Sequence, residues 1–195
     1  MNIAIYIYDD AEVLDFSGPY EVFSTAARIA NQPDVFTPFL VAETLQPVTA
    51  RAGYRVLPHY DVAKHPPIDV LLVVGGVHDA EMHKPAVIDW IRTQSVTAQH
   101  VASVCTGAFL LAKAGVIRDH TVTTHWEDIA DLREMFPALT VLENQRWADA
   151  GSVTTSAGIS AGIDMSLSLV RRFAGDALAT ATARKMEYDW RDTAA

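Results

Sequence analysis

The sequence has only one cysteine, Cys105, among its 195 residues, so an intramolecular disulfide is excluded. Basic residues are also scarce, because 15 Lys and Arg against 24 Asp and Glu give a net charge of -9. This balance argues against a nucleic-acid partner, since proteins that bind phosphate backbones normally present a basic patch. A lone thiol stays reduced and available for chemistry in a cytoplasmic protein, which is the location we expect.

Long hydrophobic runs are absent as well. No apolar stretch approaches the roughly 20 residues that cross a bilayer, so no membrane partner is expected. Residues 1–8 lack the basic flank and the cleavage site of a signal peptide. The chain also shows no repeat, linker or low-complexity segment, and we therefore expect one domain over residues 1–195.

Two common binding motifs are missing. Residues 75–78, Gly-Gly-Val-His, do not have the G-x-G-x-x-G spacing of a dinucleotide site. His78 and His83 lie near acidic residues, but a separation of five positions does not align two ligands on one helix face. The sequence therefore predicts neither a bound cofactor nor a metal ion.

The apolar pattern predicts an α/β fold. Residues 3–8 and 70–74 are continuous apolar runs, which are typical of parallel strands covered on both faces by helices. Between them the pattern predicts a helix that opens after Gly18-Pro19 and reaches about Ala30, followed by a strand over residues 35–42. This alternation is typical of a parallel sheet with crossover helices.

The second half repeats the strand-then-helix scheme. We expect a helix over residues 85–97, and a strand and a helix within 100–115, with Gly115 at the helix end. Residues 139–154 read as short strands with a turn at 149–151. A further helix is predicted over residues 159–173, where Gly158 and Gly162 would allow close backbone packing.

Cys105 is the strongest candidate for a nucleophile. It lies between a β-branched run and a helical pattern, which places its sulfur on a sharp bend from strand to helix. The free N–H groups and the dipole at a helix N-terminus favour a thiolate there, and the N–H of Thr106 is a candidate to stabilise negative charge. The alternative is an inert cysteine that fills a gap in the core.

Three further segments are candidate parts of a site. Asp15 follows the first strand among apolar neighbours, so we expect partial desolvation, a raised pKa and a role in proton transfer; a helix cap is the alternative. Gly75 and Gly76 end a strand and would bring a backbone N–H close to a substrate, or form a plain tight turn. His125, followed by Trp126, fits a proton shuttle or a structural histidine.

These motifs together resemble the ThiJ/PfpI superfamily. The resemblance covers nearly the whole chain and is carried by five segments: 14–19 (Leu-Asp-Phe-Ser-Gly-Pro), 103–107 (Ser-Val-Cys-Thr-Gly), 114–115, 123–126 (Thr-Thr-His-Trp) and 157–164 (Ala-Gly-Ile-Ser-Ala-Gly-Ile-Asp). It implies a flavodoxin-like three-layer sandwich with a cysteine elbow. Within the superfamily the segments resemble the isocyanide hydratase branch in particular. Relatives are commonly dimers, so the resemblance implies a homodimer for this chain as well.

The resemblance implies roles for individual residues. In that branch the cysteine, an aspartate and backbone amides act, which corresponds here to Cys105, Asp15 and the N–H of Thr106, while Ile159 corresponds to a residue facing the active site. Peptidase-like members carry a histidine directly after the cysteine, and amidotransferases use a late His-x-Glu. This chain has Thr106 after the cysteine and no histidine after His125, so neither activity is expected.

We therefore predict a cysteine-dependent hydro-lyase that converts a small isocyanide to a formamide. Cys105 and Asp15 are the predicted catalytic pair, the amides of Thr106 and Gly76 would hold charge, and Gly75, His125, Trp126 and Ile159 would line the pocket. Two alternatives remain open, a redox or electrophile sensor built on Cys105, and a glyoxalase- or deglycase-like enzyme. The domain also resembles the sensor half of AraC-type regulators.

Overall fold

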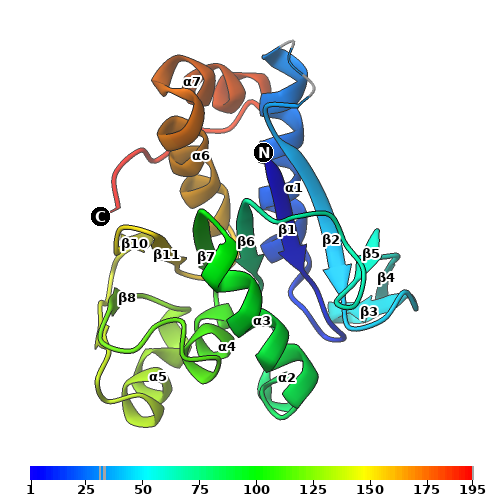
Figure 1. The fold of residues 1–195 in the computed structure, drawn as a ribbon. Helices are drawn as coiled ribbons and strands as arrows, with labels where there is room; N and C mark the ends of the chain where they lie inside the picture. The colour runs from blue at the N-terminus through cyan, green and yellow to red at the C-terminus, as the bar shows by residue number, and fades with distance from the viewer. Residues whose placement is uncertain (31, 33, 195) are drawn as a thin grey trace.

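The structure is a computed structural model that describes residues 1–30, 32 and 34–194. Its centre is a seven-stranded sheet in the order β10-β11-β7-β6-β1-β2-β5 (Figure 1). All neighbouring strands are parallel except β10 and β11 at one edge. The seven strands span β1 (Asn2–Tyr6), β2 (Thr37–Ala42), β5 (Tyr60–Asp61), β6 (Val70–Val73), β7 (His100–Val104), β10 (Trp147–Asp149) and β11 (Val153–Ser156).

Helices cover both faces of this sheet, as Figure 1 shows. The helices α1 (Val13–Ile29), α6 (Ala161–Ala174) and α7 (Asp176–Lys185) pack on one another in one layer. The helices α2 (Asp79–Met82), α3 (Pro85–Thr97) and α4 (Gly107–Lys113) form the other layer. The predicted three-layer α/β sandwich with a mostly parallel sheet is therefore confirmed.

Smaller elements extend the ends of the sheet. A hairpin of β3 (Val48–Ala50) and β4 (Tyr54–Val56), joined by the short helix η1 (Arg51–Gly53), lies beside the first turn of α1. At the opposite end, β8 (Thr121–Val122) pairs with β9 (Thr140–Val141), and η2 (Trp126–Asp128) leads into α5 (Ile129–Met135). The sequence interpretation did not include this hairpin, α5 or α7.

The central strands are buried along their length, which is why they read as continuous apolar runs. Every residue of β6 and β7 is buried, as are Ile3–Tyr6 of β1. Trp90 of α3 packs on Tyr6 from one face, with 5.4 Å between the ring centroids. On the other face, a side chain on Gly162 of α6 would come within 2.9 Å of Val104, so the predicted close approach at Gly162 is confirmed.

The first helix begins earlier than predicted. It starts at Val13 rather than after Gly18-Pro19, and Pro19 lies inside it. Proline favours the first turn of a helix, so its position suggested a start. Tertiary packing overrides that preference, because Gly18 and Pro19 are buried and Gly18 lies against Ile163 of α6. Asp15 consequently belongs to the first turn of α1 instead of the loop before it.

The other predicted elements agree more closely with the structure. The helix predicted over residues 85–97 is α3, and α4 ends just before Gly115, whose φ of 71° ends the helix in the left-handed region. The predicted turn at 149–151 joins β10 to β11, where the N–H of Gly151 donates to Asp149 Oδ1 at 2.9 Å. None of the described helices is long and apolar enough to cross a membrane.

Candidate active site

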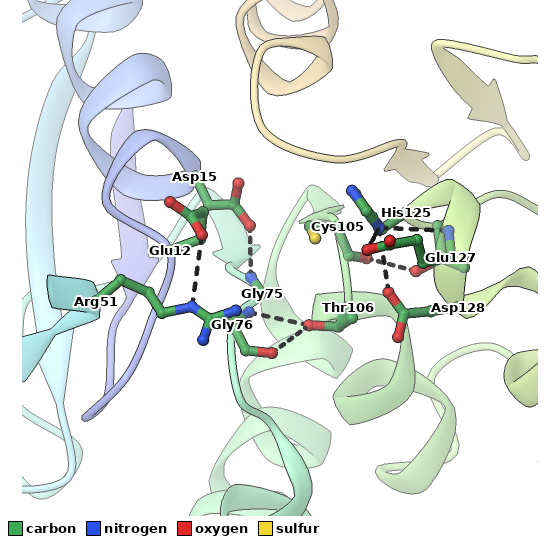
Figure 2. Close-up of polar contacts among 11 residues, drawn as sticks. Glu12, Asp15, Arg51, Gly75, Gly76, Cys105, Thr106, His125, Glu127 and Asp128 are labelled. Atoms are coloured by element: carbon green, nitrogen blue, oxygen red, sulfur yellow. Dashed lines mark hydrogen bonds and ion pairs between the residues drawn. The ribbon is translucent and has the colours of Figure 1, made fainter.

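The strand order brings three candidate segments together at one edge of the sheet. From β1 the chain moves outward to β2 on one side and later to β6 and β7 on the other. In such sheets ligands bind beyond the carboxyl ends of the strands where the order reverses. Asp15 follows β1, Gly75 follows β6 and Cys105 follows β7, and Figure 2 shows these residues facing one another.

Cys105 occupies the predicted bend between β7 and α4. Its φ of 56° lies in the left-handed region, which is uncommon for a residue with a side chain and marks a strained elbow. Neighbouring segments fix this conformation, because the Cys105 N–H donates to the Ala157 carbonyl at 3.3 Å and its carbonyl accepts from Thr124 Oγ1 at 2.9 Å. The side chain is 7% exposed.

The glycine pair at 75–76 closes the space between the elbow and α1. A Cβ on Gly75 would lie 2.7 Å from Cys105 Cβ and 2.8 Å from Thr106 Oγ1, so only glycine fits there. The Gly75 N–H donates to Asp15 Oδ2 at 3.1 Å. Gly75 therefore helps to hold the Asp15 carboxyl in place, and its place in a substrate pocket stays a prediction.

The Gly76 N–H is not free to stabilise negative charge on a substrate. It donates to Thr106 Oγ1 at 2.9 Å, and the Thr106 hydroxyl in turn donates to the Gly76 carbonyl at 3.0 Å (Figure 2). The prediction that Gly76 supplies such a donor is therefore wrong in this structure. The Thr106 N–H instead faces the sulfur and lowers the pKa of Cys105.

Asp15 is fully buried, and its electrostatics follow the prediction. Burial raises the pKa of Asp15 from 3.8 to about 7, while the Gly75 N–H, which donates to Oδ2, and the nearby Ile159 N–H and Cys105 thiol oppose that rise. The nearby charge of Glu12 raises the pKa further, although Arg51 partly balances Glu12 across 3.6 Å. Asp15 can therefore hold or release a proton near neutral pH.

The electrostatics of Cys105 differ from the prediction. Burial raises the pKa of the Cys105 thiol above its ordinary value, and the charge of Asp15 raises it further. Desolvation outweighs the hydrogen bond of the Thr106 N–H, which lowers the pKa of the thiol. The sulfur therefore ionises most easily when its proton moves to Asp15, because that transfer removes the opposing negative charge.

Ile159 faces the site through its backbone. Its φ is 56°, which is strained for a β-branched residue, and its N–H lowers the pKa of Asp15. The side chain is 38% exposed. The residue implied by the resemblance is thus placed next to Asp15.

His125 lies on the other side of the sulfur from Asp15 (Figure 2). Its Nδ1 is 3.4 Å from Asp128 Oδ2 and 3.7 Å from Glu127 Oε2. The charge of Asp128 raises the pKa of Cys105, so this carboxylate acts on the sulfur through space. Gly158 packs against the imidazole, since a Cβ there would overlap His125 Cδ2 and lie 3.0 Å from Cγ.

Trp126 belongs to a neighbouring cavity instead of the wall beside the sulfur. It is 75% exposed and lines a cavity of about 500 Å³ that also includes Thr124 and Ala157 but not Cys105. Trp126 therefore lines this neighbouring cavity and not the wall beside Cys105. Thr124 and Ala157 connect the two places, because both bind the backbone of Cys105.

Two residues near the sulfur escaped the sequence interpretation. Tyr8 is 3% exposed, and the charges of Asp15 and Cys105 both raise its pKa. Its place at the carboxyl end of the first apolar run was the available signal. Asp128 gave no comparable signal, because an acidic residue directly after Glu127 is typical of a solvated loop. Within the described ranges no group of three metal-ligating side chains gathers.

The parallel sandwich and the strained cysteine elbow define a flavodoxin-like class of protein with a candidate nucleophile above the sheet. The family model described as "DJ-1/PfpI family" matches residues 1–172. The chain belongs to the DJ-1/PfpI family, also called ThiJ/PfpI, as the sequence motifs indicated.

Comparison with individual proteins adds detail. The chain is 32% identical to isonitrile hydratase from Pseudomonas putida over 190 residues, which cover 96% of this chain and 78% of that protein. It is 28% identical to the HTH-type transcriptional regulator GbdR of Pseudomonas aeruginosa, covering 96% of this chain and 51% of the regulator. A solved ThiJ/PfpI family protein from Pseudomonas syringae superposes with a TM-score of 0.86 at 27% identity, covering 96% of this chain and 75% of that one. The relatives thus include both an enzyme and a transcriptional regulator.

Proposed function

We propose that this protein hydrates a small isocyanide to an N-substituted formamide, with Cys105 as nucleophile and Asp15 as proton carrier. The observation that supports this most directly is a buried carboxyl group, with a pKa of about 7, held by the Gly75 N–H beside a cysteine that no histidine follows. An isocyanide has no leaving group to protonate, so its chemistry requires a nucleophile and one movable proton. The relative named isonitrile hydratase aligns with 96% of the chain.

The first half of the reaction forms a thioimidate. Asp15 takes the proton of Cys105, and the sulfur attacks the terminal carbon of the isocyanide. The electron pair that develops on this carbon then takes the proton back from Asp15. The Thr106 N–H faces the sulfur and would stabilise its negative charge. In the second half, water adds to the thioimidate and releases the formamide and the thiol.

The sensor alternative fits the site less well. Redox-sensing thiols are normally exposed and have a low pKa, whereas Cys105 is 7% exposed and burial raises its pKa. A ligand-sensing role for this protein is the second candidate function, because its relatives include transcriptional regulators. Mild peroxide followed by mass spectrometry tests the redox-sensor alternative, because a sensor thiol would oxidise faster than a model thiol. A glyoxal assay tests the carbonyl alternative.

The direct test is formamide production from a panel of alkyl and aryl isocyanides, followed by the NMR signal of the formyl proton. Cys105→Ala should lower kcat/KM by roughly three or more orders of magnitude. Tyr60→Phe, on the sheet edge at β5, serves as a control that leaves the site untouched. Wild-type-like activity in Cys105→Ala would contradict the proposal, and so would a wild-type protein inactive on the whole panel.

A further inference from the structure

Two buried polar atoms beside Cys105 have no hydrogen-bond partner among the described residues. They are Tyr8 Oη and Asp15 Oδ1. Tyr8 is 3% exposed and Asp15 is fully buried. Buried polar atoms in proteins are nearly always paired, so two unpaired atoms near one sulfur indicate a further polar group that binds between them.

The two atoms are chemically complementary. The Asp15 carboxylate accepts hydrogen bonds, and its other oxygen, Oδ2, already accepts from the Gly75 N–H. The Tyr8 hydroxyl is a donor, and burial together with the charge of Asp15 raises the pKa of Tyr8 well above its ordinary value. The phenol therefore stays protonated over the working pH range and always has a hydrogen to donate.

The other polar side chains that influence Tyr8 are engaged elsewhere. The Thr106 hydroxyl exchanges two hydrogen bonds with Gly76. Glu81 accepts from the Tyr6 hydroxyl and pairs with Lys84 at 2.9 Å. Thr106 lies near enough to lower the pKa of Tyr8, but Tyr8 Oη makes no hydrogen bond of good geometry to any described residue, so its donor is left for a further group.

We propose that Tyr8 Oη and Asp15 Oδ1 together hold the water molecule that attacks the thioimidate on Cys105. This inference rests on the proposed function and assigns its second substrate to a place. A bound water needs two to four polar partners, and one buried donor and one buried acceptor supply the minimum. Tyr8 thereby becomes a further catalytic residue, which touches the attacking oxygen.

The step balances with the groups present. The water oxygen bonds to the thioimidate carbon as one water proton moves to Asp15, and the C=N electron pair moves to nitrogen, which takes that proton from Asp15. The C–S bond then breaks with its electron pair on sulfur. The hydroxyl proton passes through Asp15 to the sulfur, which leaves an N-substituted formamide and a free thiol.

The experiment separates formation of the thioimidate from its breakdown. Excess isocyanide is mixed with each of three proteins: wild type, Tyr8→Phe and the control Tyr60→Phe. Samples are quenched at a series of times, and intact-protein mass spectrometry measures the mass of each. In Tyr8→Phe we expect the adduct on Cys105 to form at the wild-type rate and to break down on the order of 100-fold more slowly, so that it accumulates. Tyr60→Phe should match wild type.

Thermal unfolding of the same three proteins shows whether the substitution acts through stability. Tyr8→Phe removes a hydroxyl without a protein partner, so its midpoint should equal or exceed that of wild type. A lower adduct yield, or an adduct that breaks down as fast as in wild type, would overturn the role of Tyr8 alone. If wild type forms no adduct and no formamide, the proposed function is overturned, and the assignment of the attacking water is overturned with it.

A crystal structure of the free protein at high resolution gives a second readout that does not depend on turnover. We expect a water within hydrogen-bond distance of both Tyr8 Oη and Asp15 Oδ1, and its loss in Tyr8→Phe. A Tyr8 hydroxyl bonded directly to a protein group would contradict the inference.

Discussion

Thr106 and Gly76 exchange two hydrogen bonds across the elbow: the hydroxyl donates to the glycine carbonyl at 3.0 Å and accepts from the glycine N–H at 2.9 Å. This pair fixes the loop after β6 against the start of α4. Thr106→Val keeps the shape of the side chain but leaves both backbone groups of Gly76 without this partner. We expect a loss of about 1–3 kcal/mol in the free energy of unfolding, measured by urea denaturation. Thr106→Ser keeps the hydroxyl and should retain most of the wild-type free energy of unfolding. Equal losses in the two variants would show that the methyl group matters instead of the hydroxyl.

The raised pKa of Asp15 predicts how stability depends on pH. Below about pH 4 this carboxyl is neutral in both the folded and the unfolded chain. Between pH 4 and 7 the unfolded chain ionises while the folded protein, with a pKa of about 7, keeps the proton, so stability falls as pH rises and levels off above pH 7.

Asp15→Asn removes this ionisation. The free energy of unfolding of wild type relative to Asp15→Asn should therefore fall by on the order of 2–4 kcal/mol between pH 4 and pH 8. Urea titrations at five pH values measure this difference, and groups that do not interact with Asp15 cancel in the comparison. Parallel stability curves would show that Asp15 titrates normally.

Gly158 and His125 are predicted to be coupled through space. Gly158 has no positive φ, so alanine suits its backbone, but the added Cβ would overlap the imidazole. Gly158→Ala should cost about 1–3 kcal/mol of stability through overpacking. In the His125→Ala background the same change should cost much less, and a double-mutant cycle by chemical denaturation measures the difference. Additive effects would contradict the predicted contact.

The ion pair of Arg146 with Asp164 is predicted to stabilise the start of α6. Asp164 is fully buried, and it also accepts from the Arg191 N–H at 3.1 Å. Arg146→Met would leave a buried charge without its partner, at a cost of about 3–5 kcal/mol. The exposed pair of Arg28 with Glu21 provides the control, where Arg28→Met should cost less than about 1 kcal/mol. Thermal unfolding compares the two variants.

The sequence predicts the fold well where burial is strongest. The apolar runs of β1 and β6 are covered on both faces, so their composition alone indicates a parallel sheet, and the bend at Cys105 follows from the change of pattern around it. The start of α1 was missed because Pro19 is a local signal, whereas the packing of Gly18 on Ile163 joins residues 145 positions apart.

The site was predictable in its members more than in its electrostatics. The pattern indicated Cys105, Asp15 and Gly75 because each follows a strand of the same sheet. Two outcomes depend on long-range contacts that no local pattern contains. The Gly76 N–H donates to Thr106 Oγ1, and the Cys105 thiol is desolvated beside the Asp15 carboxyl. Tyr8 was missed because an aromatic residue at the end of an apolar run is usually part of the core.

Cys105 is the sole thiol of the sequence and is 7% exposed, so every sulfhydryl-specific dye reports on one known position. The rate of thiol labelling would then report how often the elbow opens, as hydrogen exchange does for backbone amides. The native thiol thus serves as a probe of local opening, and variants around the elbow can be ranked by their opening rates without introducing another cysteine.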